Sequence, residues 1–232
     1  MLRAVVFDLD DTLYSERDYA ISGFRAVASW AAGHFGTDAG LTHAEFVAIF
    51  DGDGRYDTFD RWLARRGLAS DDAAARMLDV YRTHIPQISP HPAAEGILDR
   101  LGGHFRIGLL SDGPLEVQRR KLRVLGIAGR FDQIMFTDEL GRDMWKPSPV
   151  GFRNLLARLE VDGCDALYIA DNPTKDFIGA RLVGMGTIRV RSRHGLYRHL
   201  EAPSPEHAPD LEVEDLAQVE LVLDRAVARS EA

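Results

Sequence analysis

Residues 4–14 read Ala4-Val5-Val6-Phe7-Asp8-Leu9-Asp10-Asp11-Thr12-Leu13-Tyr14, an apolar run of strand type that ends in three carboxylates and a hydroxyl. Like charges this close repel, and each raises the pKa of its neighbours unless a cation neutralises them. A divalent metal explains the cluster, and Mg2+ in particular is held by one or two carboxylates with water and substrate phosphate. A strand that ends in a solvated acidic turn explains these residues equally well, so the rest of the chain must decide.

The composition is that of a globular protein with an acidic balance. The 232 residues are 45% hydrophobic and 28% charged, which allows one large domain or a core with an insertion. A formal net charge of -8 argues against binding to nucleic acid or to an anionic membrane. We therefore expect no nucleic-acid partner and no membrane partner.

Cysteine content and the position of the first strand bear on the compartment. The single cysteine, Cys164, excludes an intramolecular disulfide and is typical of a reducing compartment. The first strand begins by Arg3 and leaves no room before it for a signal peptide. No apolar run approaches the ~18 residues that span a bilayer. These features predict a cytoplasmic protein, while its oligomeric state cannot be read from the sequence.

The order of apolar patterns predicts an α/β protein with a helical insertion. Residues 15–86 have helical periodicity throughout, and after them strand patterns alternate with helical ones. The later strands are predicted at 105–110, 133–137, 166–170 and 187–190. Residues 201–210 are interpreted as a surface connection before a closing helix that carries Leu216, Val219, Val222, Leu223 and Val227. We predict a doubly wound, mainly parallel sheet formed by 1–14 and 87–232, with an all-helical cap at 15–86.

Polar residues follow four of the predicted strands at the points where they end. Residues 8–12 follow the first strand and 111–113 the second, Lys146 follows the third, and 171–176 follow the fourth. In doubly wound sheets the ligand lies beyond the carboxyl ends of the strands, so these residues should share one crevice. Carboxylates, a hydroxyl, a lysine and a glycine-proline turn that opens a helix are typical of metal-assisted phosphoryl transfer.

This arrangement resembles the haloacid dehalogenase-like (HAD) hydrolase superfamily, in the subgroup with a helical cap after the first motif. Residues 8–12 match the first motif, Ser111 the second, Lys146 the third and residues 171–176 the acidic fourth. The match runs through the predicted core in order, and four motifs at four strand ends are more specific than any one. The resemblance implies a Rossmann-like core, a phosphatase activity and a cap that sets substrate specificity.

The resemblance also implies a role for each acidic residue. Asp8 would be the nucleophile that forms an aspartyl-phosphate, and Asp10 would be the general acid and then the base that activates water. Mg2+ would be held by Asp8, Asp171 and the main-chain carbonyl of Asp10, with Asp176 bound directly or through water. Asp11 is interpreted as supporting rather than catalytic, because its side chain should point away from Asp10.

The phosphoryl group would be bound by the second and third motifs. Ser111 and the amides of Asp112 and Gly113 would donate to its oxygens, and Lys146 would pair with both Asp8 and the phosphoryl group. Asp112 stands where many relatives have asparagine, which leaves the role of its side chain open. Supporting roles fall to Asn172 and to Thr12, which would brace the first loop by hydrogen bonding.

Lys146 has an alternative interpretation as a solvated turn residue, which is the commoner fate of a lysine before proline. The chain has only three lysines, however, and the other two, Lys121 and Lys175, fall on predicted helices. This rarity favours a site role for Lys146.

Contacts with the rest of a substrate are harder to predict. Segment 189–199 is the strongest basic patch of the chain, and it is either a solvated loop or a site where Arg191 and Arg193 meet a second anionic group. Polar or aromatic candidates at the ends of the cap are Arg17, Arg55 and Tyr56.

We therefore predict a Mg2+-dependent phosphatase that acts on a small phosphorylated metabolite. The presence of Asp10 argues against a dehalogenase, which lacks an acid at that place in this superfamily. The absence of lysine between Tyr14 and Pro90 argues against phosphonate hydrolysis, which uses a cap lysine. Two alternatives stay open: a sugar phosphomutase with the same carboxylates, and a non-catalytic HAD-like binding protein. The substrate itself cannot be named from the sequence.

Overall fold

The computed structural model describes residues 1–230, and it describes side chains as far as residue 223. The side chain of Val227 and the last two residues of the predicted core therefore lie outside the described part. The chain divides into two compact units. A core unit comprises Met1–Arg17 and Ile88–Ala232, and an inserted unit comprises Asp18–Gln87.

Within the described residues, the core unit is built on a six-stranded sheet in which each pair of neighbouring strands is parallel. The strands are β1 (Ala4–Phe7), β2 (Arg106–Ser111), β3 (Gln133–Phe136), β4 (Ala166–Ala170), β5 (Gly186–Val190) and β6 (Leu211–Val213). They lie in the order β3-β2-β1-β4-β5-β6. This order is that of a doubly wound sheet, which confirms the predicted fold class.

β6 is absent from the predicted strands, because three residues are too few to show an alternating pattern. It pairs with β5 at the edge of the sheet, where Val190 lies opposite Val213. Of its residues only Val213 is buried. The stretch interpreted as a surface connection thus ends in an edge strand before the closing helix.

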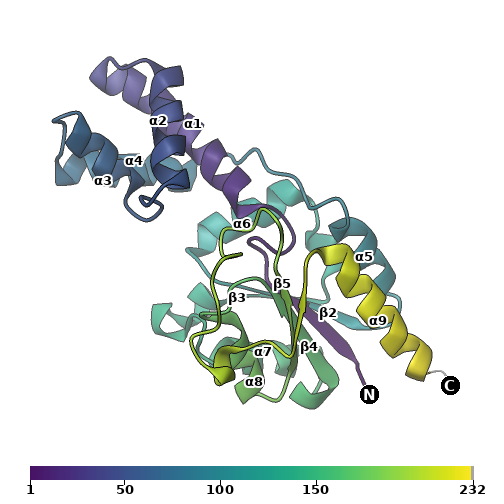
Figure 1. Ribbon diagram of the computed structural model, residues 1–232. Coiled ribbons are helices and arrows are strands. Elements are labelled where there is room, and N and C mark those ends of the chain that lie inside the picture. The colour runs from purple at the N-terminus through teal and green to yellow at the C-terminus, as the bar shows by residue number, and fades with distance from the viewer. Residues whose placement is uncertain (231–232) are drawn as a thin grey trace. The chain divides into compact units, whose positions relative to one another are not determined.

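Helices cover both faces of the sheet. The helices after the inserted unit are α5 (Ala94–Leu101), α6 (Leu115–Leu125), α7 (Val150–Leu159), α8 (Asp176–Leu182) and α9 (Leu216–Ser230). α7 and α8 pack on one face, while α5 and α9 contact each other and strands of the sheet on the other (Figure 1). Phe152 of α7 and Phe177 of α8 belong to the same buried cluster as Val6 of β1. Burial on both sides explains why β1 is a continuous apolar run.

The inserted unit is helical over most of its length. The helices that begin between Glu16 and Asp71 are α1 (Glu16–Phe35), α2 (Ala39–Asp51), α3 (Thr58–Arg65) and α4 (Asp71–Thr83). Its interior holds a group of aromatic rings, among them Phe24, Phe46, Phe59 and Tyr81, with ring centroids 5.4–5.9 Å apart. Edge-to-face and tilted aromatic pairs of this kind stabilise a core beyond the area they bury.

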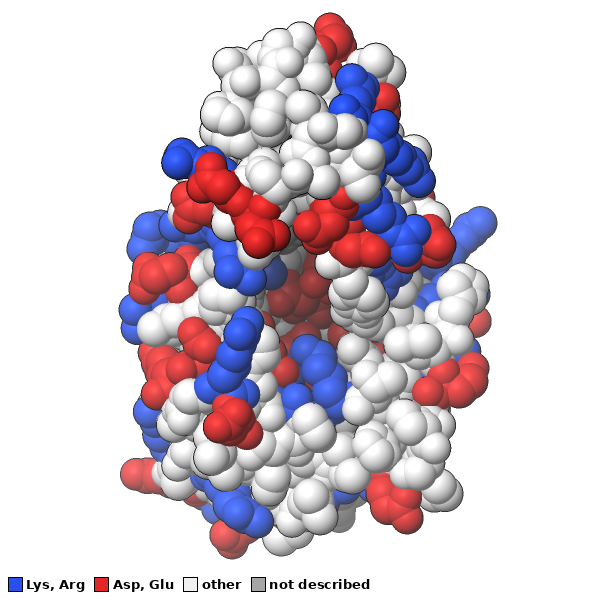
Figure 2. All heavy atoms as spheres, turned by 90° about the vertical axis from the view of Figure 1, so that its left-hand side faces the viewer, with Lys and Arg blue, Asp and Glu red and all other residues white. Residues whose placement is uncertain are grey.

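On the face drawn in Figure 2, groups of lysine and arginine lie beside groups of aspartate and glutamate, with large uncharged areas between them. Among residues 1–230, no helix has the length and the apolar character needed to cross a membrane.

Candidate active site

The candidate site lies at the carboxyl end of the sheet, where β1 and β4 end next to each other. Asp8 follows β1 and Asp171 follows β4, and the Asp8 amide donates to the Ile169 carbonyl at 2.9 Å. The strand order reverses here, because β2 and β3 lie to one side of this pair and β5 and β6 to the other. Doubly wound sheets bind their ligands at this switch point.

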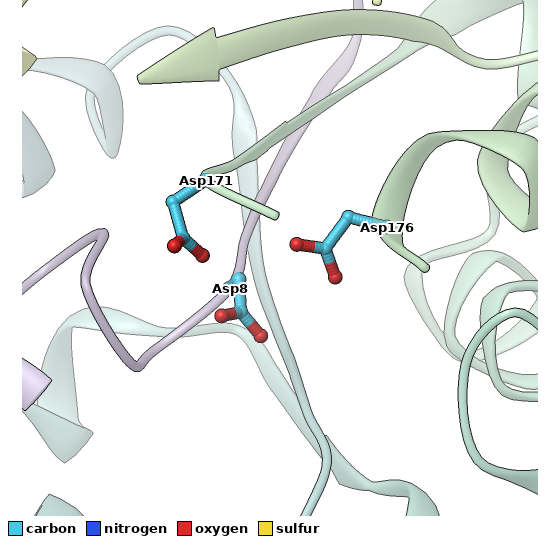
Figure 3. A group of neighbouring side chains, drawn as sticks. All are labelled: Asp8, Asp171 and Asp176. Carbon is cyan, nitrogen blue, oxygen red and sulfur yellow. The ribbon is translucent and has the colours of Figure 1, made fainter. Parts of the chain in front are cut away.

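Three buried carboxylates lie close together at this edge: those of Asp8, Asp171 and Asp176 (Figure 3). Each offers a ligand oxygen, and these oxygens all lie within 4.8 Å of one another. One oxygen of Asp176 accepts from the Asn172 amide at 2.9 Å. Asp171 Oδ2 and Asp176 Oδ1 are buried without a hydrogen-bond partner. Asp176 Oδ1 has the charge of Lys146 beside it, whereas Asp171 Oδ2 has no donor, and an oxygen buried in this way is costly. The three carboxylates therefore fit a bound cation.

The electrostatics and the donor set fit a hard divalent cation. Burial raises the pKa of Asp8 to about 7, even though the charge of Lys146 opposes the shift. Burial and the charges of Asp176 and Asp11 raise the pKa of Asp171 well above its ordinary value. A bound cation would favour the ionised form of each group. Because all the candidate metal ligands are carboxylate oxygens, the residues suit Mg2+ rather than a metal that prefers nitrogen or sulfur.

Lys146 lies fully buried among the acidic residues. Its ammonium donates to Asp8 Oδ1 at 2.6 Å and to the Tyr168 hydroxyl at 3.0 Å. It also forms an ion pair with Asp176 Oδ1 at 2.7 Å, outside the alignment of a hydrogen bond. Burial alone would lower the pKa of Lys146, but the charges of Asp176 and Asp8 raise it well above its usual range. The side chain is therefore a fixed positive charge against Asp8, as its predicted role requires.

Asp10 is directed to a separate set of donors. Its Oδ1 accepts from Lys121 Nζ at 2.7 Å and from the Tyr14 hydroxyl, while its Oδ2 accepts from Gln118 Nε2 at 2.8 Å. Burial alone would raise the pKa of Asp10, but the charge of Lys121 and these hydrogen bonds hold it below its ordinary value. The carboxylate of Asp10 lies outside the group that could bind a metal, so a metal contact through its main-chain carbonyl stays a prediction.

The loop after β2 has the geometry of a close turn. Ser111 is fully buried, and its hydroxyl accepts from Gln118 Nε2 at 2.6 Å, which leaves the hydroxyl hydrogen for another acceptor. Gly113 has a φ of 123°, and a Cβ at this position would lie 3.2 Å from Gln118 Cδ. The Leu115 amide at the start of α6 donates to Asp138 Oδ2 at 2.9 Å. That amide is thus already paired and does not point freely at an anion.

The side chain of Asp112 has a defined structural role. Its Oδ1 accepts from Thr137 Oγ1 at 2.6 Å and from the Lys146 amide at 3.2 Å, and its Oδ2 lies 3.4 Å from Lys175 Nζ. Burial opposes ionisation, but the charges of Lys146 and Lys175 hold the pKa of Asp112 below its ordinary value. Asp112 therefore ties the second motif to the backbone of the third.

The first loop is braced by Asp11 rather than by Thr12. The Thr12 hydroxyl is buried and has no hydrogen-bond partner, so its predicted bracing bond is wrong. Asp11 instead accepts from the Glu16 amide at 2.8 Å and from the Leu196 amide at 2.6 Å. Its φ of 51° turns the side chain away from the strand direction, and aspartate tolerates this conformation better than most residues. These contacts are structural, and the supporting role of Asp11 stays a prediction.

Asn172 builds the turn that leads into α8. Its side-chain oxygen accepts from the Thr174 amide at 3.0 Å and from the Thr174 hydroxyl at 2.8 Å. Its own amide donates to Asp176, and its carbonyl accepts from the Asp176 amide at 3.1 Å. The residue acts by fixing the position of Asp176.

Within the basic segment, Arg191 makes structural contacts. Arg191 forms ion pairs with Glu201 and with Glu212, and its Nε donates to the Arg198 carbonyl at 2.8 Å. Its guanidinium is thus engaged in the surface of the core unit, which argues against the predicted substrate contact. Arg193 is exposed, and its predicted contact stays a prediction.

The remaining candidates belong to different units. Arg17 is half-buried in the core unit, whereas Arg55 and Tyr56 lie in the inserted unit. Arg55 lies over the Phe50 ring, and Tyr56 is 85% exposed. Both line a cavity of about 280 Å³ within the inserted unit. Their contacts with substrate stay predictions.

The lysines that were assigned to helices also belong to the site. Lys121 on α6 contacts Asp10, and Lys175, just before α8, contacts Asp112. All three lysines of the chain thus lie at the carboxyl edge of the sheet. Their rarity in a chain with 28 lysines and arginines was the signal that could have found them.

Comparisons with known proteins identify the family of the chain. Residues 2–184 match the family described as haloacid dehalogenase-like hydrolase. Glyceraldehyde 3-phosphate phosphatase of Methanopyrus kandleri is 30% identical over 223 residues, which cover 92% of this chain and 94% of that protein. Phosphoserine phosphatase of Thermus thermophilus is 31% identical over 176 residues, which cover 75% of this chain and 67% of that protein. The crystal structure of 2-haloacid dehalogenase from Pseudomonas syringae pv. Tomato is 25% identical with a TM-score of 0.66, covering 97% of this chain and 99% of that one.

Proposed function

This chain belongs to the haloacid dehalogenase-like hydrolase family and is a phosphatase, and we propose that it uses Mg2+ and an aspartyl-phosphate to hydrolyse a small phosphorylated metabolite. The observation that carries the proposal is the separation of the two aspartates of the first motif. Asp8 lies with Lys146 and the other buried carboxylates, whereas Asp10 has its own donors. A bound cation would favour the ionised, nucleophilic form of Asp8, whereas the Asp10 side chain lies outside the group that could hold the metal.

The proposed reaction has two steps. In the first, a carboxylate oxygen of Asp8 bonds to phosphorus as the bond between phosphorus and the leaving oxygen breaks, and Asp10 gives that oxygen a proton. In the second, Asp10 takes a proton from water, whose oxygen bonds to phosphorus. The bond from Asp8 to phosphorus then breaks and inorganic phosphate leaves. Lys146 offsets the negative charge that gathers on the phosphoryl group.

Mg2+ would be held by Asp8, Asp171 and Asp176, with the Asp10 carbonyl as a further ligand. When bound, it supplies positive charge that orients and polarises the phosphoryl group. The chain supports these ligands from behind: Arg189 is fully buried, and its Nε donates to the Asp171 carbonyl at 3.0 Å. This bond fixes the backbone at the point where β4 ends.

Dehalogenation is the alternative that the structural neighbour from Pseudomonas syringae raises. A halide leaves as a stable anion and needs no proton, whereas an alkoxide must be protonated as it leaves. The three donors to Asp10 would have no purpose in a dehalogenase. The presence of this supported carboxylate therefore favours phosphoryl transfer.

A sugar phosphomutase would use the same carboxylates and differ in whether water reaches the aspartyl-phosphate. A binding protein would need neither a nucleophile nor an acid. Relatives that act on glyceraldehyde 3-phosphate and phosphoserine support hydrolysis of a small metabolite. In this proposal the inserted unit, as a cap, selects the substrate, and the location in the cytoplasm stays a prediction from the sequence.

A substrate panel tests the proposed function. Purified protein should release phosphate from one or more small phosphorylated metabolites in Mg2+, and the release should stop in EDTA. The panel should include glyceraldehyde 3-phosphate, phosphoserine, sugar phosphates and an (S)-2-haloacid. Release of halide, or phosphate release that survives EDTA, would overturn the proposal. Conversion of a sugar phosphate into its isomer without free phosphate would identify a phosphomutase.

We further predict that Mg2+ stabilises the protein more at about pH 8 than at about pH 5, because protons and metal compete for the same carboxylates. The pKa values of Asp8 and Asp171 are higher in the folded protein than in the unfolded chain, where an aspartate has a pKa of about 4. Without metal, the free energy of unfolding therefore falls as the pH rises from about 4 through the pKa values of the folded protein. The lowered pKa values of Asp10 and Asp112 act only at lower pH, so they do not cancel this trend.

Thermal unfolding measures this effect. Mg2+ at a hundred times its dissociation constant should raise the melting temperature by about 5–10 °C at the higher pH, from about 2.7 kcal/mol of binding free energy. The rise should be markedly smaller at the lower pH. An equal rise at both pH values would place the metal away from these carboxylates.

A further inference from the structure

Two polar side chains on one face of α6 are buried, although their residue types usually lie at the surface. Gln118 is 1% exposed and Lys121 is 5% exposed. A separation of three residues on a helix directs side chains to the same side. Burial of an amide and an ammonium is tolerated only where each finds partners, so the face of α6 that carries them must meet polar groups.

Those partners are Asp10 and Ser111. Lys121 Nζ donates to Asp10 Oδ1 at 2.7 Å, and Gln118 Nε2 donates to Asp10 Oδ2 at 2.8 Å. The same Gln118 nitrogen donates to Ser111 Oγ at 2.6 Å. Gln118 therefore joins the proposed acid–base group to the hydroxyl that is proposed to bind phosphate. Both oxygens of Asp10 are held from a single helix.

The close packing around Gln118 leaves its amide little freedom. The backbone of Gly113 approaches it so closely that a Cβ there would lie 3.2–3.3 Å from three atoms of the Gln118 side chain. The Tyr14 hydroxyl reaches Asp10 from the first loop, on the same oxygen that Lys121 contacts. The carboxylate is thus held from two segments that are far apart in the sequence.

We propose that Gln118 and Lys121 are positioning residues that orient the Asp10 carboxylate for proton transfer to the leaving oxygen and, later, from water. The inference rests on the proposed function, in which Asp10 is the acid–base group. Proton transfer needs donor and acceptor within hydrogen-bond reach, and a carboxylate that rotates freely meets that geometry only part of the time. Donors on both oxygens, anchored on one rigid helix, remove that rotation.

A purely structural role for this pair makes a different prediction. Loss of packing or of a buried hydrogen bond would slow the reaction of every substrate alike. Loss of proton transfer instead slows substrates whose leaving group needs a proton, and spares those whose leaving group departs as a stable anion. The parameter kcat/KM reports the first step, and kcat for a fast-leaving substrate reports hydrolysis of the common aspartyl-phosphate.

The experiment compares ethyl phosphate, a poor leaving group, with para-nitrophenyl phosphate, a good one, in Mg2+. For Lys121→Met and for Gln118→Met we expect kcat/KM with ethyl phosphate to fall about 100-fold, the lower end of what general acid–base catalysis contributes. With para-nitrophenyl phosphate kcat/KM should change less than about 3-fold, while kcat falls because water activation is also impaired. Lys121→Arg, which keeps a charged donor, should restore part of the loss.

Three comparisons make the outcome decisive. Arg119→Met removes a charge from the exposed side of α6, where Arg119 pairs with Glu116 at 3.0 Å, and should leave both substrates unaffected. Asp10→Asn is the benchmark for lost proton transfer. If it fails to discriminate between the substrates, the proposed function is wrong; if it discriminates and the α6 variants do not, only this inference is wrong. Should Lys121→Met fail to fold, Gln118→Met carries the test, since it contacts the same carboxylate.

Discussion

Asp8→Asn should abolish phosphate release, lowering kcat by about ten-thousand-fold or more, as loss of the nucleophile does in other hydrolases with covalent intermediates. The amide has the shape of the carboxylate but cannot attack phosphorus. It keeps an acceptor oxygen for Lys146, whose ammonium lies 2.6 Å from Asp8 Oδ1. The substitution therefore removes the chemistry with little change in packing.

The same variant should be at least as stable as the parent protein when metal is absent. Burial raises the pKa of Asp8 to about 7, so the folded protein favours the neutral side chain over the ionised one. Asparagine is permanently neutral and also removes a charge that repels Asp171 and Asp176. In EDTA at about pH 8 the melting temperature of Asp8→Asn should equal or exceed that of the parent, since this is where the ionised form costs most.

Asp11→Asn is the matched control, because it makes the same chemical change three residues away. Asp11 accepts from two backbone amides, those of Glu16 and Leu196, and asparagine can serve only one of them well. This variant should lose about 1–3 kcal/mol of unfolding free energy, the cost of an unsatisfied buried group. Its activity should stay within about tenfold of the parent, because positioning effects of a supporting residue are smaller than loss of the nucleophile. Activity retained in Asp8→Asn would contradict the covalent mechanism.

The sheet was predictable because its central strands are buried on both sides. Such strands must be apolar throughout, and β1 and β4 show this as short runs that end in charged residues. The topology of a parallel sheet then brings the ends of β1 and β4 together without further information. β6 was not predicted, because an edge strand with one buried residue has no comparable apolar pattern in the sequence.

The charged partners were less predictable because long side chains reach across the fold. Lys121 lies 111 positions from Asp10 in the sequence, and nothing in its local pattern distinguishes it from a solvated helix lysine. The same holds for Tyr168, whose position within β4 predicts burial but not its hydroxyl contact with Lys146. Asp11 braces the first loop in place of Thr12 because the positive φ at Asp11 turns its carboxylate onto backbone amides. A strand extrapolated through the first loop cannot anticipate that turn.

Lys146→Met should cost both stability and activity. In EDTA at about pH 8 we expect the free energy of unfolding to fall by about 3–5 kcal/mol, the cost of removing one partner of a buried ion pair. The lysine side chain is fully buried, as are its partners Asp8 and Asp176. Methionine fills a similar volume, so the loss is electrostatic rather than steric. The turnover number should fall by a hundredfold or more, since the loss of one preorganised hydrogen-bond donor to the transition state reduces kcat by about this factor.

The pH dependence separates this loss from a packing defect. The charge of Lys146 opposes the raised pKa of Asp8, so without it that pKa rises further above about 7. When folding raises the pKa of a carboxyl group, that group destabilises the protein increasingly as the pH rises above about 4, its pKa in the unfolded chain. The stability difference between Lys146→Met and the parent should therefore grow from about pH 5 to about pH 8. A packing defect would give the same difference at both pH values.

Lys175→Met provides the control, because it removes a lysine from the same edge of the sheet but from a looser contact. Lys175 Nζ lies 3.4 Å from Asp112 Oδ2, and its side chain is 34% exposed. A partly solvated pair of this kind contributes at most about 1 kcal/mol, so this variant should lose little stability. The double variant Lys146→Met with Asp176→Asn should recover part of the loss, because it removes a carboxylate that the lysine no longer neutralises. Both lysine variants could instead lose the same small amount of unfolding free energy at every pH. The buried cluster would then not depend on Lys146 for its charge balance, and the folded protein without metal would need another tightly bound counterion.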